Sequence, residues 1–282
     1  MPLKLRHLAL PILLLALAVA TGVSARSQNR PGADVSFVWP NQKRAALSLS
    51  FDDARASQLT TGVPLFAEYG AKVTFYLTAS AIGDRAAQWR EAGRAGHELA
   101  NHSMVHPCSG NFAWARDKAL EDYTLDRMRA ELSDANRAIQ EMTGVTPATF
   151  AYPCGQAFVG RGTRIASYAP IVSELFLAGR AWLSETSNDP AFVDLAQVLG
   201  HRMDDVVYPE LKPALDAALA SGRWLVLAGH DISATPGPQV TRVSMLRDLL
   251  ADLRRADSPY WTDTVANVAK YVKAQQTGKE GK

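Results

Sequence analysis

The sequence predicts an α/β fold, specifically a distorted (β/α) barrel of seven or eight strands, TIM-like and built as a single domain. Short apolar runs rich in β-branched and aromatic residues alternate with segments of helical spacing, which is typical of parallel sheets. Without a leader of 25 residues the chain has about 257 residues, close to the roughly 250 of such a barrel. Residues 35–275 contain no internal repeat and no Pro/Gly/Ser-rich linker, so we expect one domain.

The expected elements follow one another along the chain. Strands are predicted at 45–51, 72–77, 98–102, 149–152 and 224–228 from their apolar, β-branched and aromatic content. Helices are predicted at 56–69, 86–95, 122–142, 239–255 and 262–274, with Gly70 and Gly144 ending two of them. The helix at 122–142 has the clearest apolar face, made of Leu125, Met128, Leu132, Ala135, Ile139 and Met142.

The first 25 residues have the layout of a secretory signal peptide. Lys4 and Arg6 precede an apolar run at 8–20, and small residues at 23–25 offer a cleavage site. The run is shorter than the roughly 20 residues that span a bilayer, although an uncleaved anchor is the alternative. We therefore expect a signal peptide (1–25), an N-terminal extension (26–44), one catalytic domain (45–275) and a polar tail (276–282). The mature protein is expected in the periplasm or outside the cell, without a membrane span.

Composition narrows the function classes. The chain is 47% apolar and 21% charged, as a globular protein is. Without Lys4 and Arg6, the 30 basic residues become 28, equal to the 28 acidic ones. This balance argues against a nucleic-acid binder and does not favour a strongly anionic polymer as substrate. Two cysteines cannot supply a four-cysteine zinc site or a disulfide-built scaffold.

Polar residues gather where predicted strands end. These clusters are Asp52-Asp53, His102 with His106, Pro153-Cys154-Gly155 and His230-Asp231. Because the C-terminal ends of parallel barrel strands share one face, we expect the four clusters to converge on one pocket.

Each cluster has a chemical interpretation beside a structural one. His102 and His106 would lie one helical turn apart if their segment is helical, and with one carboxylate they would form a zinc site with open positions. Asp52-Asp53 is either a solvated turn or a metal ligand beside a general base. His230 is either a general acid or a satisfied histidine at the barrel rim. The turn at Cys154 either presents a backbone N–H to an oxyanion or is structural.

The order of these motifs resembles the polysaccharide deacetylases of the NodB-homology type, carbohydrate esterase family 4. The resemblance runs from about Leu47 to Val272. It rests on four segments in the family's order, which read SFDD (50–53), HSMVHP (102–107), FAYPCG (150–155) and LVLAGH (225–230).

The resemblance implies a role for each matching position. Asp53, His102 and His106 would hold one divalent metal ion, usually Zn²⁺, and Asp52 would be the general base. His230 would be the general acid, and the backbone N–H of Cys154 would stabilise the oxyanion. The implied reaction is metal-assisted removal of acetyl groups from an N- or O-acetylated polysaccharide or oligosaccharide, which releases acetate.

Two departures from the family pattern matter. Ala151 stands where many members have an arginine that orients the catalytic aspartate, which leaves Arg161, Arg164 or Arg202 as candidates for that task. Cys154 stands where family members often have a tyrosine. A role played by the backbone N–H at this position should not depend on that change. The family's tryptophan-containing motif is not found, so the residue that orients His230 is open among Asp194, Asp204 and Asp205.

The cysteines and aromatic residues add further expectations. Cys108 directly follows the second motif and Cys154 lies within the third. We expect a disulfide between them, with two free thiols or a cysteine ligand as alternatives. Phe112, Trp114 and Tyr152 are candidate substrate contacts. Trp89, Trp182 and Trp224 are expected in the core.

Other classes fit less well. The chain has no serine in the Gly-x-Ser-x-Gly setting of a serine hydrolase, and the adjacent Asp52 and Asp53 are poorly spaced to flank a glycosidic bond. The remaining alternatives are an O-acetyl esterase or cyclic-amide hydrolase on the same scaffold, and a carbohydrate-binding protein that has lost its activity.

Overall fold

The computed structural model describes residues 37–280, and the predicted signal peptide (1–25) lies outside this range. Eight strands form one sheet in which every pair is parallel. Their order is β7-β4-β3-β2-β1-β9-β8, with β12 also pairing with β1. The strands are β1 (Ala45–Asp52), β2 (Thr74–Leu77), β3 (Glu98–Asn101), β4 (Thr149–Ala151), β7 (Ala178–Arg180), β8 (His201–Arg202), β9 (Trp224–Gly229) and β12 (Tyr260–Thr262).

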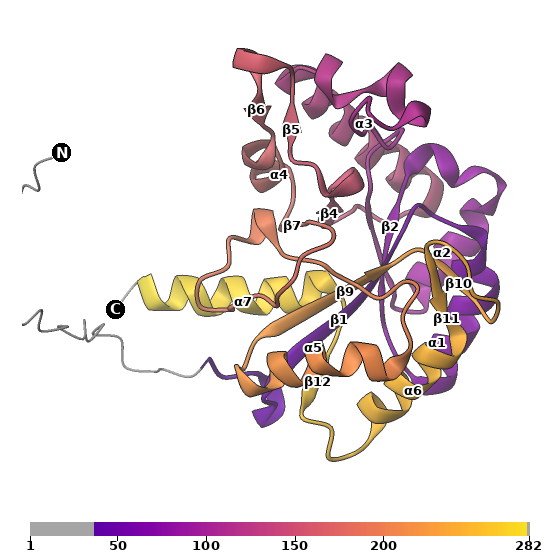
Figure 1. The fold of residues 1–282 in the computed structure, drawn as a ribbon, viewed down its shortest axis with the longest axis vertical. Helices are drawn as coiled ribbons and strands as arrows, with labels where there is room; N and C mark the ends of the chain where they lie inside the picture. Colours follow the sequence, from indigo (N-terminus) through magenta and orange to yellow (C-terminus); the bar gives the residue numbers. More distant parts are fainter. Residues whose placement is uncertain (1–36, 281–282) are drawn as a thin grey trace, which may run out of the picture. The chain divides into compact units, whose positions relative to one another are not determined.

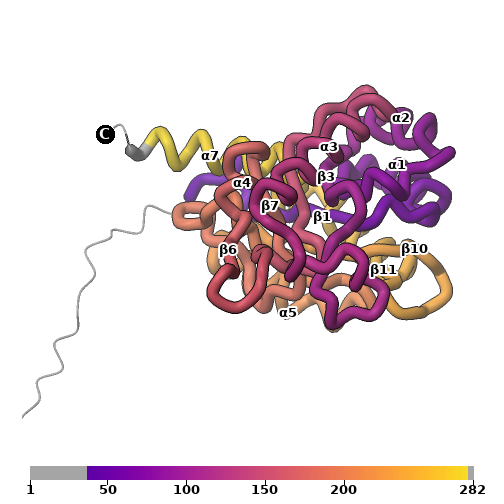
Figure 2. Tube along the Cα trace, turned by 90° about the horizontal axis from the view of Figure 1, so that it is seen from above, coloured from indigo at the N-terminus to yellow at the C-terminus, as the bar shows by residue number. Residues whose placement is uncertain are grey.

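Helices connect these strands, as a parallel sheet requires. They are α1 (Val63–Tyr69), α2 (Ala86–Arg94), α3 (Leu125–Thr143), α4 (Ala169–Leu175), α5 (Tyr208–Ala220), α6 (Val243–Arg254) and α7 (Val265–Glu280). Figure 1 shows β1 and β9 side by side at the centre, and α2 and α7 lie on opposite sides of the molecule in both views (Figures 1 and 2). Two small pairs of strands lie apart from the main sheet, β5 (Phe158–Val159) with β6 (Ala166–Ser167) and β10 (Asp231–Ser233) with β11 (Val240–Arg242).

The sheet closes into a distorted barrel through the segment at 198–202. Val198 forms backbone hydrogen bonds with Gly179 and Ala181 at the β7 edge. A few residues later, β8 pairs with β9 at the opposite edge. The segment therefore joins both edges of the sheet, and the predicted α/β barrel is confirmed.

Apolar packing holds the helices against the outside of the barrel. The largest core cluster joins Leu47, Leu49 and Phe51 of β1 with buried residues of α1, α2, α5 and α6. A second cluster places α7 against Ala46 and Val226. At about 25 cal/mol per Å² of apolar area, such burial is the main stabilising contribution to the fold.

Most expected elements are present, with informative differences at their ends. The predicted helix at 56–69 starts with a π-helical turn (Gln58–Gly62) and ends at Gly70, whose φ of 66° glycine adopts without strain. The predicted helix at 239–255 begins only at Val243, because 240–242 form β11. The residues predicted as a tail from 276 continue α7 as far as Glu280. Leu125 is exposed rather than part of the apolar face of α3.

Part of the predicted extension at 26–44 contacts the barrel. Trp39 is buried, packs with Trp224 and Val265, and donates a hydrogen bond to the Gly222 carbonyl. None of the helices between residues 37 and 280 has the length and apolar composition needed to cross a bilayer.

Candidate active site

A cavity of about 630 Å³ opens at the C-terminal ends of the sheet strands. Its walls include Asp52, Asp53, His102, His106, Cys154 and His230. Asp52 ends β1, and the other residues lie in the segments that follow β1, β3, β4 and β9. The four predicted polar clusters therefore converge on one pocket.

Three side chains form a cluster suited to a metal ion. The Asp53 Oδ1 atom lies 3.5 Å from the Nε2 atoms of both His102 and His106. The ligand atoms of the three residues lie within 4.8 Å of one another. Two imidazole nitrogens and a carboxylate oxygen are donors that zinc and related divalent ions accept. The side chains present thus fit a divalent metal ion.

The tautomer of His102 leaves the correct nitrogen for such a ligand. Its Nδ1 atom lies 2.8 Å from the Ala151 carbonyl, which can only accept a hydrogen bond. Nδ1 therefore carries the proton, and the lone pair of Nε2 points to the cluster.

A loop, rather than the helical turn considered for His-x-x-x-His, brings His106 to this cluster. Ser103 and His106 both have positive φ, 65° and 57°, which interrupts any helix. The Ser103 hydroxyl accepts a hydrogen bond from the His106 N–H, and Glu131 Oε1 accepts two more from Met104 and Val105. The helical expectation is wrong for this segment, although both imidazoles reach the same point.

The cluster favours an ionised Asp53 and a neutral His106. Burial opposes ionisation of Asp53, but the neighbouring histidines and a hydrogen bond from Arg55 bring its pKa to about 2. Burial, reinforced by His102, lowers the pKa of His106 to about 4. Arg55 also donates to Asp231 and Gln239, so it ties Asp53 to the loop around β10 and β11.

Asp52 is held beside the cluster by Arg180, a partner that the sequence did not suggest. Its Oδ2 lies 3.9 Å from His102 Nε2, and its Oδ1 accepts a hydrogen bond from Arg180 Nη2. Burial raises the pKa of Asp52, but the charge of Arg180, followed by those of His102 and His230, brings it below its ordinary value. Asp52 is therefore a carboxylate that can accept a proton.

Arg180 explains how the chain tolerates an alanine at position 151. Ala151 of β4 and Arg180 of β7 are directly paired in the sheet register. The guanidinium thus approaches Asp52 from the neighbouring strand and also lies 4.9 Å from the Tyr76 ring. Of the three arginines considered from the sequence, Arg161 instead pairs with Asp122 at the surface.

Asp204 is the residue that orients His230. Its Oδ2 lies 2.6 Å from His230 Nδ1, and its Oδ1 accepts hydrogen bonds from the His230 N–H and the Thr241 hydroxyl. Burial lowers the pKa of His230, but the Asp204 hydrogen bond and the Asp52 charge outweigh burial and raise it. Asp194, another candidate, instead caps the short helix Leu195–Gln197.

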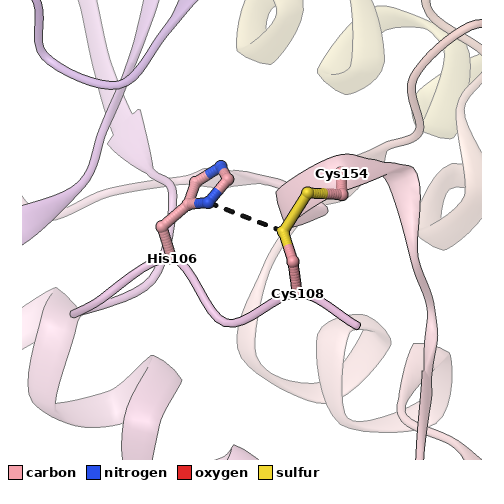
Figure 3. Close-up of side chains that lie close together, drawn as sticks. All are labelled: His106, Cys108 and Cys154. Carbon is pink, nitrogen blue, oxygen red and sulfur yellow. Dashed lines mark hydrogen bonds between the residues drawn. A yellow bond between two sulfur atoms is a disulfide. The ribbon is translucent and has the colours of Figure 1, made fainter. Parts of the chain in front are cut away.

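The turn after β4 is bound covalently to the loop that carries His106. Cys108 and Cys154 form the expected disulfide, with their Cα atoms 6.0 Å apart (Figure 3). Within the turn, the Gly155 and Gln156 N–H groups donate to Tyr152 and Pro153. Cys154 has a φ of 55° and lines the cavity.

Aromatic residues form the outer wall of the cavity. The rings of Phe112 and Trp114 stack 5.5 Å apart and are both partly exposed. Trp182, expected in the core, instead lines the cavity with its ring edge-to-face against His230. Tyr152 borders the cavity, but its side chain is buried and its hydroxyl donates to Ala196. Trp89 and Trp224 are buried as expected.

Comparison with known proteins supports the resemblance. A family model described as polysaccharide deacetylase matches residues 40–167, which include the first three motifs.

Two curated relatives match parts of the chain. A protein from a Bacillus species named gellan lyase is 29% identical over 275 residues, 89% of this chain and 10% of the relative. Chitin deacetylase 1 from Cryptococcus neoformans is 28% identical over 107 residues, 38% of this chain and 20% of the relative. The chain thus spans a tenth and a fifth of the lengths of these relatives.

A solved structure shares the fold. A protein from Mycobacterium smegmatis described as a polysaccharide deacetylase superposes with a TM-score of 0.63 at 20% identity. The match covers 85% of this chain and 94% of the other.

Proposed function

We propose that this chain is a metal-dependent hydrolase that removes acetyl groups from carbohydrates, a proposal supported by its match to the polysaccharide deacetylase family model over residues 40–167. The observation that carries the proposal is the convergence of Asp53, His102 and His106 within 4.8 Å, with Asp52 and His230 lining the same cavity. A divalent ion bound there, most simply Zn²⁺, supplies Lewis acidity and lowers the pKa of a coordinated water toward about 7.

The side chains around the cluster take complementary parts in the hydrolysis. Asp52, ionised and held by Arg180, accepts the proton of the attacking water. The Cys154 N–H donates to the acetyl oxygen as negative charge develops on it.

His230 completes the reaction at the leaving group. Because Nδ1 faces Asp204, Nε2 is the ring nitrogen that gives a proton to the departing sugar nitrogen or oxygen. The bond from the acetyl carbon to the sugar breaks, water supplies the oxygen of the new carboxylate, and acetate leaves.

We propose an N-acetylated sugar as the preferred substrate class. An amine leaves only if it is protonated, and the raised pKa of His230 keeps an acid available near neutral pH. The stacked rings of Phe112 and Trp114 offer an apolar surface to a pyranose ring.

We also propose that the enzyme works outside the cytoplasm. The leader-like residues 1–25 and the disulfide at the site both favour an oxidising compartment.

Acetate release from defined polymers tests the activity. The protein without residues 1–25 is incubated with chitin oligomers, peptidoglycan and acetylxylan, before and after treatment with a chelator. We expect acetate from at least one N-acetylated polymer, and a fall of roughly 10²-fold or more for Asp52→Asn and His230→Ala.

Phe158→Ala, at an exposed residue of β5, is a matched control that should keep the full rate. No acetate from any polymer, or full rates in both site variants, would contradict the proposal.

A further inference from the structure

The two histidines of the cluster have different partners on their second ring nitrogen. Nδ1 of His102 faces a backbone carbonyl, whereas Nδ1 of His106 lies 3.6 Å from the Sγ of Cys108 (Figure 3). That sulfur belongs to the disulfide with Cys154. Residues that hold a ligand histidine by its outer nitrogen control its tautomer and orientation.

The direction of this hydrogen bond follows from the chemistry of the disulfide. A disulfide sulfur carries no hydrogen and can only accept, so His106 Nδ1 is the donor. The lone pair of the ring is then on Nε2, 3.5 Å from Asp53 Oδ1. The contact selects the tautomer that the cluster needs.

The contact between His106 Nδ1 and the Cys108 sulfur helps to fix the position of the His106 ring. Cys108 is fully buried, so its sulfur is a fixed point. Two aromatic rings also neighbour His106: the ring of His102, 4.7 Å away, and the ring of Trp114, 5.8 Å away, which lies partly in solvent.

We propose that the Cys108–Cys154 disulfide is a positioning element for the ligand His106, and that its reduction weakens metal binding. The inference rests on the proposed function, because it takes His106 to be a ligand. It makes the metal site sensitive to the redox state of the compartment.

Reduction of the bond is a balanced two-electron step. A water-soluble phosphine attacks one sulfur, the S–S bond breaks, and both cysteines become thiols. Phosphorus is oxidised to the phosphine oxide and takes its oxygen from water, which also supplies the two protons.

A noncovalent tie between the same two loops provides a control. Ser109 directly follows Cys108, and Gln156 lies two residues after Cys154. Gln156 Oε1 accepts a hydrogen bond from the Ser109 N–H. Gln156→Ala loosens the attachment of the loops without touching His106. It therefore separates loop tethering from the contact between sulfur and imidazole.

The experiment measures the zinc dissociation constant by competition with a chromophoric chelator. Five proteins are compared under oxygen-free conditions, and the reductant is removed from the reduced sample before the measurement. They are the oxidised protein, the phosphine-reduced protein, Gln156→Ala, and the double variants Cys108→Ala/Cys154→Ala and Cys108→Ser/Cys154→Ala. Visible absorption of the cobalt-loaded proteins reports ligand geometry independently of activity.

We expect zinc affinity to fall about tenfold in Cys108→Ala/Cys154→Ala, which has no acceptor for His106 Nδ1. The reduced protein keeps a sulfur and Cys108→Ser/Cys154→Ala keeps an oxygen at position 108, but neither atom is fixed by the cross-link. Both proteins should therefore lose less affinity than the alanine variant, with a cobalt spectrum closer to that of the oxidised protein. Gln156→Ala should bind as the oxidised protein does. The two double variants lack the cross-link equally, so their difference holds even if both are less stable.

Two results would overturn the inference. One is a zinc affinity that stays within about twofold in all five proteins. The other is an equal loss in Gln156→Ala and in both double variants, since tethering alone would then explain the effect. If the oxidised protein itself fails to bind zinc, the proposed function is wrong, and this inference falls with it.

Discussion

Arg180 supplies the positive charge beside Asp52 that, in the pattern described above, comes from an arginine at the position of Ala151. The two positions are paired across β4 and β7, so an arginine on either strand points into the same end of the barrel. Its buried ion pair with Asp52 explains why that carboxylate remains ionised despite its burial.

Replacing this arginine tests its role. In Arg180→Met, the pKa of Asp52 should rise because burial is no longer opposed by the guanidinium. The acid limb of the pH–rate profile should move to higher pH, and unfolding free energy should fall by roughly 3–5 kcal/mol because a buried charge loses its partner. Acetate release across pH and urea unfolding provide the two measurements.

A transplanted arginine is the sharpest control. Because positions 151 and 180 are paired in register, Ala151→Arg/Arg180→Ala should recover part of the activity lost in Arg180→Ala. If the swap and the single variant are equally inactive, the equivalence of the two positions is disproved.

We expect Asp204 to set the upper pH limit of activity through its hydrogen bond to His230. The raised pKa of His230 keeps the ring protonated to higher pH, so the rate should fall only when the pH rises past this raised pKa. In Asp204→Asn the carboxylate charge is lost, the pKa of His230 falls, and the alkaline limb should shift to lower pH with a loss of about 10²-fold in rate. An unchanged alkaline limb would show that His230 is not the group that titrates.

Local motifs made part of the site predictable. The sequence predicted the three cluster residues, Asp52 and His230, because each lies in a short motif at a strand end. The sequence did not suggest Arg180, and it left Asp204 as one of three candidates. Their partners, Asp52 and His230, lie 128 and 26 residues away in the sequence. Only the register of the sheet brings such residues together.

At the scale of elements, long and strongly patterned segments were predictable. The apolar run of β9 and the face of α3 were found from sequence, but β7 and β8 were not, since they have three residues and two. Pro213 lies inside α5, which hides that helix from a propensity argument. The loop at 103–106 escaped because its positive φ angles depend on contacts with Glu131 and Ser103.

The last residue of β9 must be glycine for the His230 pair to form. A Cβ on Gly229 would lie 2.1 Å from Thr241 Oγ1 and 2.8 Å from Asp204 Oδ1. Gly229→Ala should therefore displace Asp204, lower the rate, and reduce unfolding free energy by about 1–3 kcal/mol.

Gly278→Ala provides the matched control for this variant. A Cβ there meets no atom within 4 Å, and the residue lies in α7, where alanine is favoured over glycine. It should keep full activity and stability. A Gly229→Ala protein with an unchanged rate and alkaline limb would contradict the packing argument.

For the whole molecule, His97 makes stability depend on pH independently of the active site. It is buried beside Phe66 and Phe75 and accepts a hydrogen bond from the Val73 N–H. Burial, with a smaller contribution from Lys72, lowers its pKa from 6.5 to about 4. Its contribution to stability is complete above pH 6.5 and is lost as pH falls toward 4.

Urea unfolding at pH 7 and pH 4.5 measures this contribution. The shift in pKa corresponds to roughly 2–3 kcal/mol between these pH values. Carboxylates also titrate in this range, so the comparison is with His97→Asn, which keeps an acceptor for Val73 but does not titrate. Between pH 7 and pH 4.5, the unfolding free energy of the variant should fall by roughly 2–3 kcal/mol less than that of the native protein. An equal fall in both proteins would contradict a neutral buried His97.

Metal-dependent acetate release tests the central claim most directly. The protein is stripped with a chelator, and Zn²⁺ is added back in fractions of an equivalent while acetate from the best N-acetylated substrate is measured. The rate should be near zero without metal and reach its plateau at one equivalent, and His102→Ala should not recover. Full acetate release by the stripped protein, or full recovery of His102→Ala, would contradict a single metal ion held by Asp53, His102 and His106.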